Sequence, residues 1–161
     1  SAGRAQVPET TIRSETLNKQ GLETAQNGKL SDAVRLFQEA IRLRPDYAAA
    51  YANLGKAFYY RRQIPEAVAA LKKAIELKPD NADGYNDLGV IYSETDRNRE
   101  AAAMIERAVR LQPNLAQAHF NLGIVYVKLK KYKEAVQSSE QAVRLEPYNA
   151  DMRIGLGDAL W

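Results

Sequence analysis

Residues 48–79 read AAAYANLGKAFYYRRQIPEAVAALKKAIELKP, and this stretch decides the fold of the chain. It returns in recognisable form at a constant displacement of 34 residues. The clearest marker is a Leu-Gly pair, which stands at residues 54–55, 88–89, 122–123 and 156–157. A proline recurs with the same period, at positions 45, 79, 113 and 147. A fixed period of this length indicates a stacked array of repeats.

The first half of the stretch predicts a helix. Tyr51, Leu54 and Phe58 fall on one face at helical spacing. We therefore expect a first helix from Ala48 to about Arg61, followed by a polar break at 61–63.

The second half predicts another helix. Pro65 suits its first turn, where the missing N–H of proline is not needed. An apolar stripe then runs through Ala67, Val68, Leu71, Ala74 and Ile75. Pro79 ends the helix because proline disfavours helical geometry in the residue before it. Each repeat is thus expected to be a pair of helices.

Small residues are expected to set how closely these helices pack. Gly55 and Ala67 allow the two helices of one repeat to approach, and Ala74 leaves room for the next repeat. A leucine in place of Ala67 would overpack the crossing, typically at a cost of about 1–3 kcal/mol.

These residues resemble the tetratricopeptide repeat, whose pattern is W-x2-L-G-x2-Y, then A-x3-F, then A and P. Residues 51–79 give Y-x2-L-G-x2-F, A-x3-L, A and P, and residues 85–113 give Y-x2-L-G-x2-Y, A-x3-I, A and P. The next copy begins at His119 and departs at Ser139, where a large apolar residue is expected. The resemblance implies an all-α fold, a right-handed superhelical solenoid of antiparallel helix pairs.

The period also predicts the organisation of the chain. Residues 1–13 read as a flexible leader or tag remnant, and residues 14–161 as the repeat domain. The expected repeats are 14–47, 48–81, 82–115 and 116–149, followed by a partial repeat or capping helix at 150–161. Repeat one matches least well, as a terminal repeat with a solvent-facing side would. The last segment has an apolar character that favours a continuing chain and predicts end-to-end dimerisation.

Composition and motifs argue against several function classes. The net charge of +3 is too small to indicate a polyanionic partner, and the cluster of lysines at 128–133 reads as a solvated turn rather than a nucleic-acid site. Cysteine is absent, and no apolar run approaches the length of a membrane span. The one histidine, His119, occupies a helix-packing position. We expect no enzyme, no cofactor and no metal site, and the sequence indicates no compartment.

The resemblance implies that the first helices line a concave groove, which in this family receives an extended or helical segment of a partner. Six first-helix positions commonly make the contacts. In repeats two to four the residues that we expect to bind a partner there are Asn53, Lys56, Tyr59, Tyr60, Asp83, Asn86, Asp87, Val90, Gln117, Phe120, Asn121, Ile124 and Val127.

Two features of this groove suggest its chemistry. Asn53, Asp87 and Asn121 occupy one equivalent position, and amides can hydrogen-bond a peptide backbone. They resemble the asparagine ladder in the superhelix of O-linked N-acetylglucosamine transferases, although such residues can equally bond within the scaffold. Apolar side chains, which include Phe120 and Ile124, stand at positions not needed for repeat packing and suggest contact with a partner.

The leading interpretation is a non-catalytic scaffold that binds a protein segment in its groove. The family's clamp for acidic C-terminal chaperone tails is absent, since its lysine and asparagine positions hold Asn18 and Leu22, then Ala52 and Lys56. Asp83 and Asp87 favour a basic or neutral partner. Two alternatives stay open: self-assembly through the repeat ends, and a substrate-recruiting segment of a larger enzyme.

Overall fold

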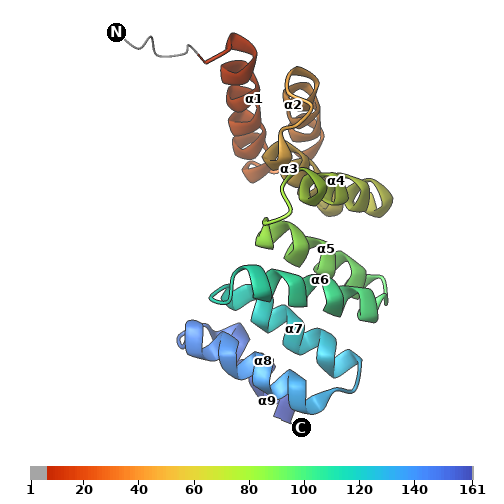
Figure 1. Ribbon diagram of the computed structural model, residues 1–161, viewed down its shortest axis with the longest axis vertical. Helices are drawn as coiled ribbons and strands as arrows, with labels where there is room; N and C mark the ends of the chain where they lie inside the picture. Colours follow the sequence, from red (N-terminus) through yellow and green to blue (C-terminus); the bar gives the residue numbers. More distant parts are fainter. Residues whose placement is uncertain (1–6, 161) are drawn as a thin grey trace. The chain divides into compact units, whose positions relative to one another are not determined.

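A computed structural model describes residues 7–160, and in this range the protein is all-α (Figure 1). The helices are α1 (Glu9–Gln26), α2 (Leu30–Leu43), α3 (Ala48–Tyr60), α4 (Ile64–Leu77), α5 (Ala82–Glu94), α6 (Asn98–Leu111), α7 (Ala116–Lys128), α8 (Tyr132–Leu145) and α9 (Ala150–Leu160). The predicted helix pairs are confirmed, and α3 and α4 begin and end within one or two residues of the expected positions.

Contacts between Cα atoms divide the chain into two compact units, with the boundary between Pro79 and Asp80. In the N-terminal unit, α1 packs on α2, α3 packs on α4, and α2 and α1 both contact α3. In the C-terminal unit, α5 pairs with α6 and α7 with α8, while α7 also contacts α5 and α9. First helices of consecutive repeats are therefore neighbours within each unit.

The structure differs from the sequence expectation at the start of the chain. A flexible leader was expected over residues 1–13, yet α1 begins at Glu9 and includes residues 9–13. Pro8 precedes the helix, and the carboxylate of Glu9 stands in its first turn, where it interacts favourably with the helix dipole. Residues 1–6 lie outside the described range.

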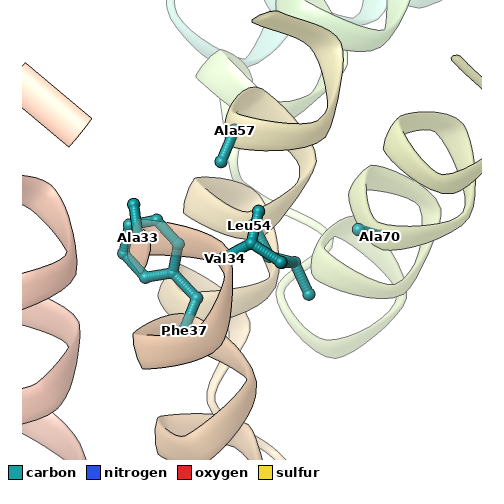
Figure 2. Packing of buried hydrophobic residues seen from close by; sticks show 6 residues of the cluster. All are labelled: Ala33, Val34, Phe37, Leu54, Ala57 and Ala70. Atoms are coloured by element: carbon teal, nitrogen blue, oxygen red, sulfur yellow. The ribbon is translucent and has the colours of Figure 1, made fainter. Parts of the chain in front are cut away.

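In the apolar core, large side chains pack where glycine and alanine leave room between helices. Figure 2 shows one cluster, in which Phe37 and Val34 of α2 meet Leu54 and Ala57 of α3. Phe37 is 1% exposed. Gly55 confirms the predicted close approach of α3 and α4, because a Cβ there would stand 2.7 Å from Leu71 Cγ.

The turn between the two helices of each repeat has a recurring backbone conformation. In repeat two, the Arg62 N–H donates to the Tyr59 carbonyl and the Gln63 N–H to the Phe58 carbonyl, both at 2.9 Å. This is the Schellman motif, and it places the residue after the helix cap in the left-handed region. The residues with positive φ are Gly28, Arg62, Asp96 and Lys130.

Lys130→Gly is expected to stabilise the protein by about 0.5–1 kcal/mol. Lys130 has a φ of 59°, which strains a side chain with a Cβ and which glycine adopts freely. The greater entropy of glycine in the unfolded chain offsets part of this gain. Urea unfolding followed by circular dichroism measures the difference.

The matched control is Gly28→Ala in the first repeat. Gly28 has a φ of 77°, and a Cβ there would meet nothing within 4 Å. Its expected loss of about 1 kcal/mol therefore comes from backbone strain and not from a steric clash. A Lys130→Gly protein less stable than the unmodified chain would contradict the strain argument.

Candidate functional site

A pocket opens between α1 and α3 in the N-terminal unit. Its volume is about 230 Å³, and its lining is almost wholly apolar. Asn53, Lys56 and Tyr60 stand on the α3 side. The tyrosine ring is 66% exposed, so it offers apolar surface to a ligand. The full lining of this α1–α3 pocket is Leu22, Ala25, Gln26, Leu30, Phe37, Asn53, Lys56, Ala57 and Tyr60.

A second pocket, of about 220 Å³, lies between α5 and α7 in the C-terminal unit. It is built from the same repeat positions, displaced by twice the period: Ile105 takes the place of Phe37, and Asn121 that of Asn53. The repeat geometry therefore produces the same kind of depression in each unit. The lining of this α5–α7 pocket is Val90, Ser93, Glu94, Ile105, Asn121, Ile124, Val125 and Lys128.

A third pocket, of about 170 Å³, lies beside the second, between α7 and α9. Ile124 and Lys128 line both pockets, so the two are adjacent along the first helices of the C-terminal unit. The lining of this α7–α9 pocket is Phe120, Gly123, Ile124, Val127, Lys128, Ser139, Gly155 and Asp158.

Pairs of asparagines link consecutive first helices beside the pockets. The Asn53 Nδ2 donates to Asn18 Oδ1 at 2.9 Å, which joins α3 to α1. The Asn121 Nδ2 donates to Asn86 Oδ1, also at 2.9 Å, which joins α7 to α5. The predicted amides thus bond within the scaffold. Asn121 Oδ1 also accepts from Gln117 Nε2 at 3.1 Å, and Asn18 Nδ2 donates to the Tyr47 hydroxyl at 3.4 Å.

Lys128 of α7 binds the C-terminal end of α5. The Lys128 Nζ donates to the Ser93 carbonyl oxygen at 2.8 Å and to the Ser93 Oγ at 3.0 Å. The positive charge stands where the C-terminal carbonyls of α5 carry a partial negative charge. Elsewhere on α7, the Tyr126 hydroxyl group donates to Glu106 Oε1 at 2.8 Å, and burial and this carboxylate raise the pKa of the phenol.

The predicted groove residues divide into two groups. Those that line a pocket are Asn53, Lys56, Tyr60, Val90, Phe120, Asn121, Ile124 and Val127. Those that line none of the three are Tyr59, Asp83, Asn86, Asp87 and Gln117. Tyr59 packs its ring 5.2 Å from that of Tyr60, centroid to centroid, and Asn86 is 7% exposed.

Phe120 requires a correction. The sequence places it at a position not needed for repeat packing, but in the structure it packs against Ala116, Ala142 and Met152. Its ring also lies over Gly155, where a Cβ would stand 2.6 Å from Phe120 Cε2. Phe120 therefore helps to hold α9 on α7 as well as lining a pocket.

Several lining residues were missed by the sequence argument. In the first helices of repeats one and five these are Leu22, Ala25, Gln26, Gly155 and Asp158. In the second helices they are Leu30, Phe37, Ile105 and Ser139. The 34-residue period could have found those of repeat one, because Leu22 and Lys56 are equivalent. The expected groove includes residues of repeats two to four alone.

Metal sites and membrane-spanning helices were also sought within residues 7–160. No cluster of three or more His, Asp or Glu side chains in this range is arranged to hold a metal ion. No helix there is both long and apolar enough to cross a membrane. His119 is bonded through Nε2 to the Pro113 carbonyl at 2.8 Å, which fits its expected structural position.

Comparison with known families gives two matching models. One, described as a TPR repeat, matches residues 21–60 and 55–96. The other, described as a tetratricopeptide repeat, matches residues 86–150. Together these matches extend over most of the chain. No curated protein sequence matches it.

Several solved structures have a similar fold. PilF of Pseudomonas aeruginosa is 24% identical with a TM-score of 0.88, over 95% of this chain and 70% of PilF. MamA from Desulfovibrio magneticus RS-1 is 18% identical with a TM-score of 0.82, over 96% of this chain and 85% of that one. YrrB, described as a TPR protein with an unusual peptide-binding site, is 21% identical with a TM-score of 0.74, over 94% and 82%.

Proposed function

Because the chain belongs to the tetratricopeptide repeat family, whose arrays are generally non-catalytic protein-interaction scaffolds, we propose that it binds a partner protein through its first helices. The bound element is an extended or helical segment of the partner. It contacts the pockets between consecutive first helices and the polar side chains beside them.

One observation carries this proposal. The pockets recur at equivalent repeat positions: one lies in the N-terminal unit, and two lie side by side in the C-terminal unit. Exposed apolar side chains stand at their edges, with Tyr60 66% and Ile124 40% exposed. Grooves of this kind, with apolar walls and a few polar groups, are typical of binding surfaces.

The polar groups suit a peptide backbone. Asn53 and Asn121 line the α1–α3 and α5–α7 pockets, and an amide side chain both donates and accepts. Backbone contacts of this kind hold a segment without reading its sequence. Selectivity then comes from the apolar side chains that enter the pockets.

Photo-crosslinking in lysate of the source organism tests the groove. The crosslinking amino acid p-benzoylphenylalanine replaces Tyr60 in one variant and Ile124 in another. The control replaces Tyr132, which is 56% exposed and lines none of the pockets. We expect one partner to be crosslinked from both groove positions and not from the control.

The recovered partner is then titrated against purified Tyr60→Ala and Ile124→Ala proteins. Each substitution removes an exposed apolar group, and we expect at least tenfold weaker binding for a central contact. Circular dichroism verifies that the variants fold. Crosslinks from Tyr132 alone, or unchanged affinity in both variants, would place the partner on another face.

Self-association through α9 is a second candidate. Ile154 and Leu160 of this helix are 62% and 63% exposed, so both offer apolar surface to a second copy of the chain. Sedimentation at increasing protein concentration is expected to show a dimer that Leu160→Glu dissociates. A monomer at all concentrations would remove this candidate.

A further inference from the structure

The α1–α3 pocket differs in charge from the two pockets of the C-terminal unit. Lys56 is the one charged residue in its described lining, whereas each of the other two pockets is lined by one acidic and one basic residue. Lys56 is also the one charged residue in the sequence of α3. The α3 wall of this pocket is therefore apolar with a single positive charge.

A second lysine stands beside the pocket on α1. Lys19 takes the place of Asn53 in the first repeat, 34 residues earlier, and it lies one turn before Leu22, which lines the pocket. Residues three apart on a helix are surface neighbours, with Cβ atoms about 5–6 Å apart. Lys19 is exposed and forms no hydrogen bond or ion pair with residues 7–160. Its ammonium group is therefore accessible to a ligand at the edge of the pocket.

Two acidic residues of α1 lie one turn before and one turn after Lys19, and neither lines the pocket. Glu15 is already paired, because its Oε1 accepts from Arg44 Nη1 at 3.0 Å. Glu23 takes the place of Ala57, which α3 turns toward α2 in the apolar cluster. On α1 the equivalent face lies away from α3, so the carboxylate of Glu23 points away from the pocket.

The N-terminal unit as a whole also has a positive net charge. Residues 1–79 include 13 Lys and Arg against 8 Asp and Glu, whereas residues 80–161 include 10 Lys and Arg against 12 Asp and Glu. The small net charge of the chain therefore combines a basic unit with an acidic one. The field of the basic unit attracts an acidic segment and raises its rate of association.

We propose that the N-terminal unit binds an acidic segment of the partner, with a large apolar side chain in the α1–α3 pocket and carboxylates beside it that face Lys19 and Lys56. This inference rests on the proposed function and specifies the chemistry of the partner at one pocket. The expectation of a basic or neutral partner rested on Asp83 and Asp87, which belong to the other unit. The segment can be internal to the partner, because recognition uses side-chain carboxylates and needs no free carboxy terminus.

Charge reversal tests the two lysines. Lys19→Glu and Lys56→Glu each replace an attraction for a carboxylate with a repulsion. Lys72→Glu is the matched control, because it changes the charge of the same unit by the same amount. Lys72 is exposed on α4 and lines none of the three pockets. All three substitutions are at exposed helix positions, and circular dichroism verifies that the variants fold.

The probe is a phage-displayed library of random peptides, selected on the unmodified protein and then synthesised for titration. Peptides seated in the α1–α3 pocket are those that bind Tyr60→Ala about tenfold more weakly or worse. We expect them to carry aspartate or glutamate next to a large apolar residue. Lys19→Glu and Lys56→Glu should each weaken them about fivefold, since an exposed ion pair is lost and a repulsion is added. Lys72→Glu should change their binding by less than about twofold at physiological salt, which screens distant charges.

The outcomes separate this inference from groove binding itself. Peptides that need Tyr60 but lack acidic residues would overturn the inference while groove binding stands. The same holds if Lys72→Glu weakens the peptides as much as the other two reversals, or if none of the three weakens them. The inference is also overturned if no selected peptide needs Tyr60. Groove binding then depends on the photo-crosslinking, and it fails as well if neither Tyr60 nor Ile124 captures a partner.

Discussion

Gly89→Ala is expected to lower the free energy of unfolding by about 2–3 kcal/mol. A Cβ at this position would stand 2.4 Å from Ile105 Cγ1 and 3.1 Å from the Ala101 carbonyl oxygen. Ile105 is fully buried, and the clash is with its Cγ1 and with the backbone of Ala101 rather than with the flexible end of a side chain. The helices α5 and α6 must separate to accept even one methyl group.

The matched control is Gly157→Ala, which changes the same repeat position in α9. A Cβ there would meet nothing within 4 Å. Alanine also favours helix over glycine by up to about 1 kcal/mol, so this variant should be as stable as the unmodified chain or more stable. Urea unfolding of both variants compares them. Equal stability of the two would show that α5 and α6 are not in close contact at Gly89.

Phe37→Ala is expected to cost about 3–5 kcal/mol. Phe37 is 1% exposed and belongs to the cluster with Ala33 and Leu54 (Figure 2). Its ring also fills the space beside Gly21, where a Cβ would stand 2.5 Å from Phe37 Cε1. Removal leaves a cavity that joins the α1–α3 pocket. The amide hydrogens of α1 and α2 should lose the most protection against exchange with solvent.

Hydrogen exchange measures this local loss because it reports opening free energy segment by segment. Phe37→Leu is the control: leucine occupies the equivalent site at Leu71, and the smaller change in volume should cost less than Phe37→Ala. If exchange in α1 and α2 were no faster in Phe37→Ala than in Phe37→Leu, the ring would not hold these helices together.

Much of the fold could be predicted because its determinants are local and periodic. Pro65 and Pro79 bound α4, and the glycines at close helix contacts stand where the pattern puts them. The start of α1 could not be predicted, since no residue between Glu9 and Arg13 forbids a helix or requires one. The positive φ of Arg62 and Lys130 could not be predicted either, because arginine and lysine have no preference for the left-handed region.

The candidate site was predictable in outline. First-helix positions at Asn53, Val90 and Ile124 line pockets as the repeat pattern implies. The bond between Asn53 and Asn18 was not predictable, because it depends on how far one helix is rotated relative to its neighbour. The place of Ser139 in the lining of the α7–α9 pocket also needed the structure.

The two asparagine pairs have a consequence for the entropy of binding. One residue corresponds to about 100° of rotation on a helix, so a small rotation of α1 against α3 would break the Asn18–Asn53 bond. The bond thus opposes rotation of α1 against α3, and Asn86–Asn121 does the same for α5 and α7. A preorganised surface loses little freedom on association, which leaves more of the contact energy as affinity.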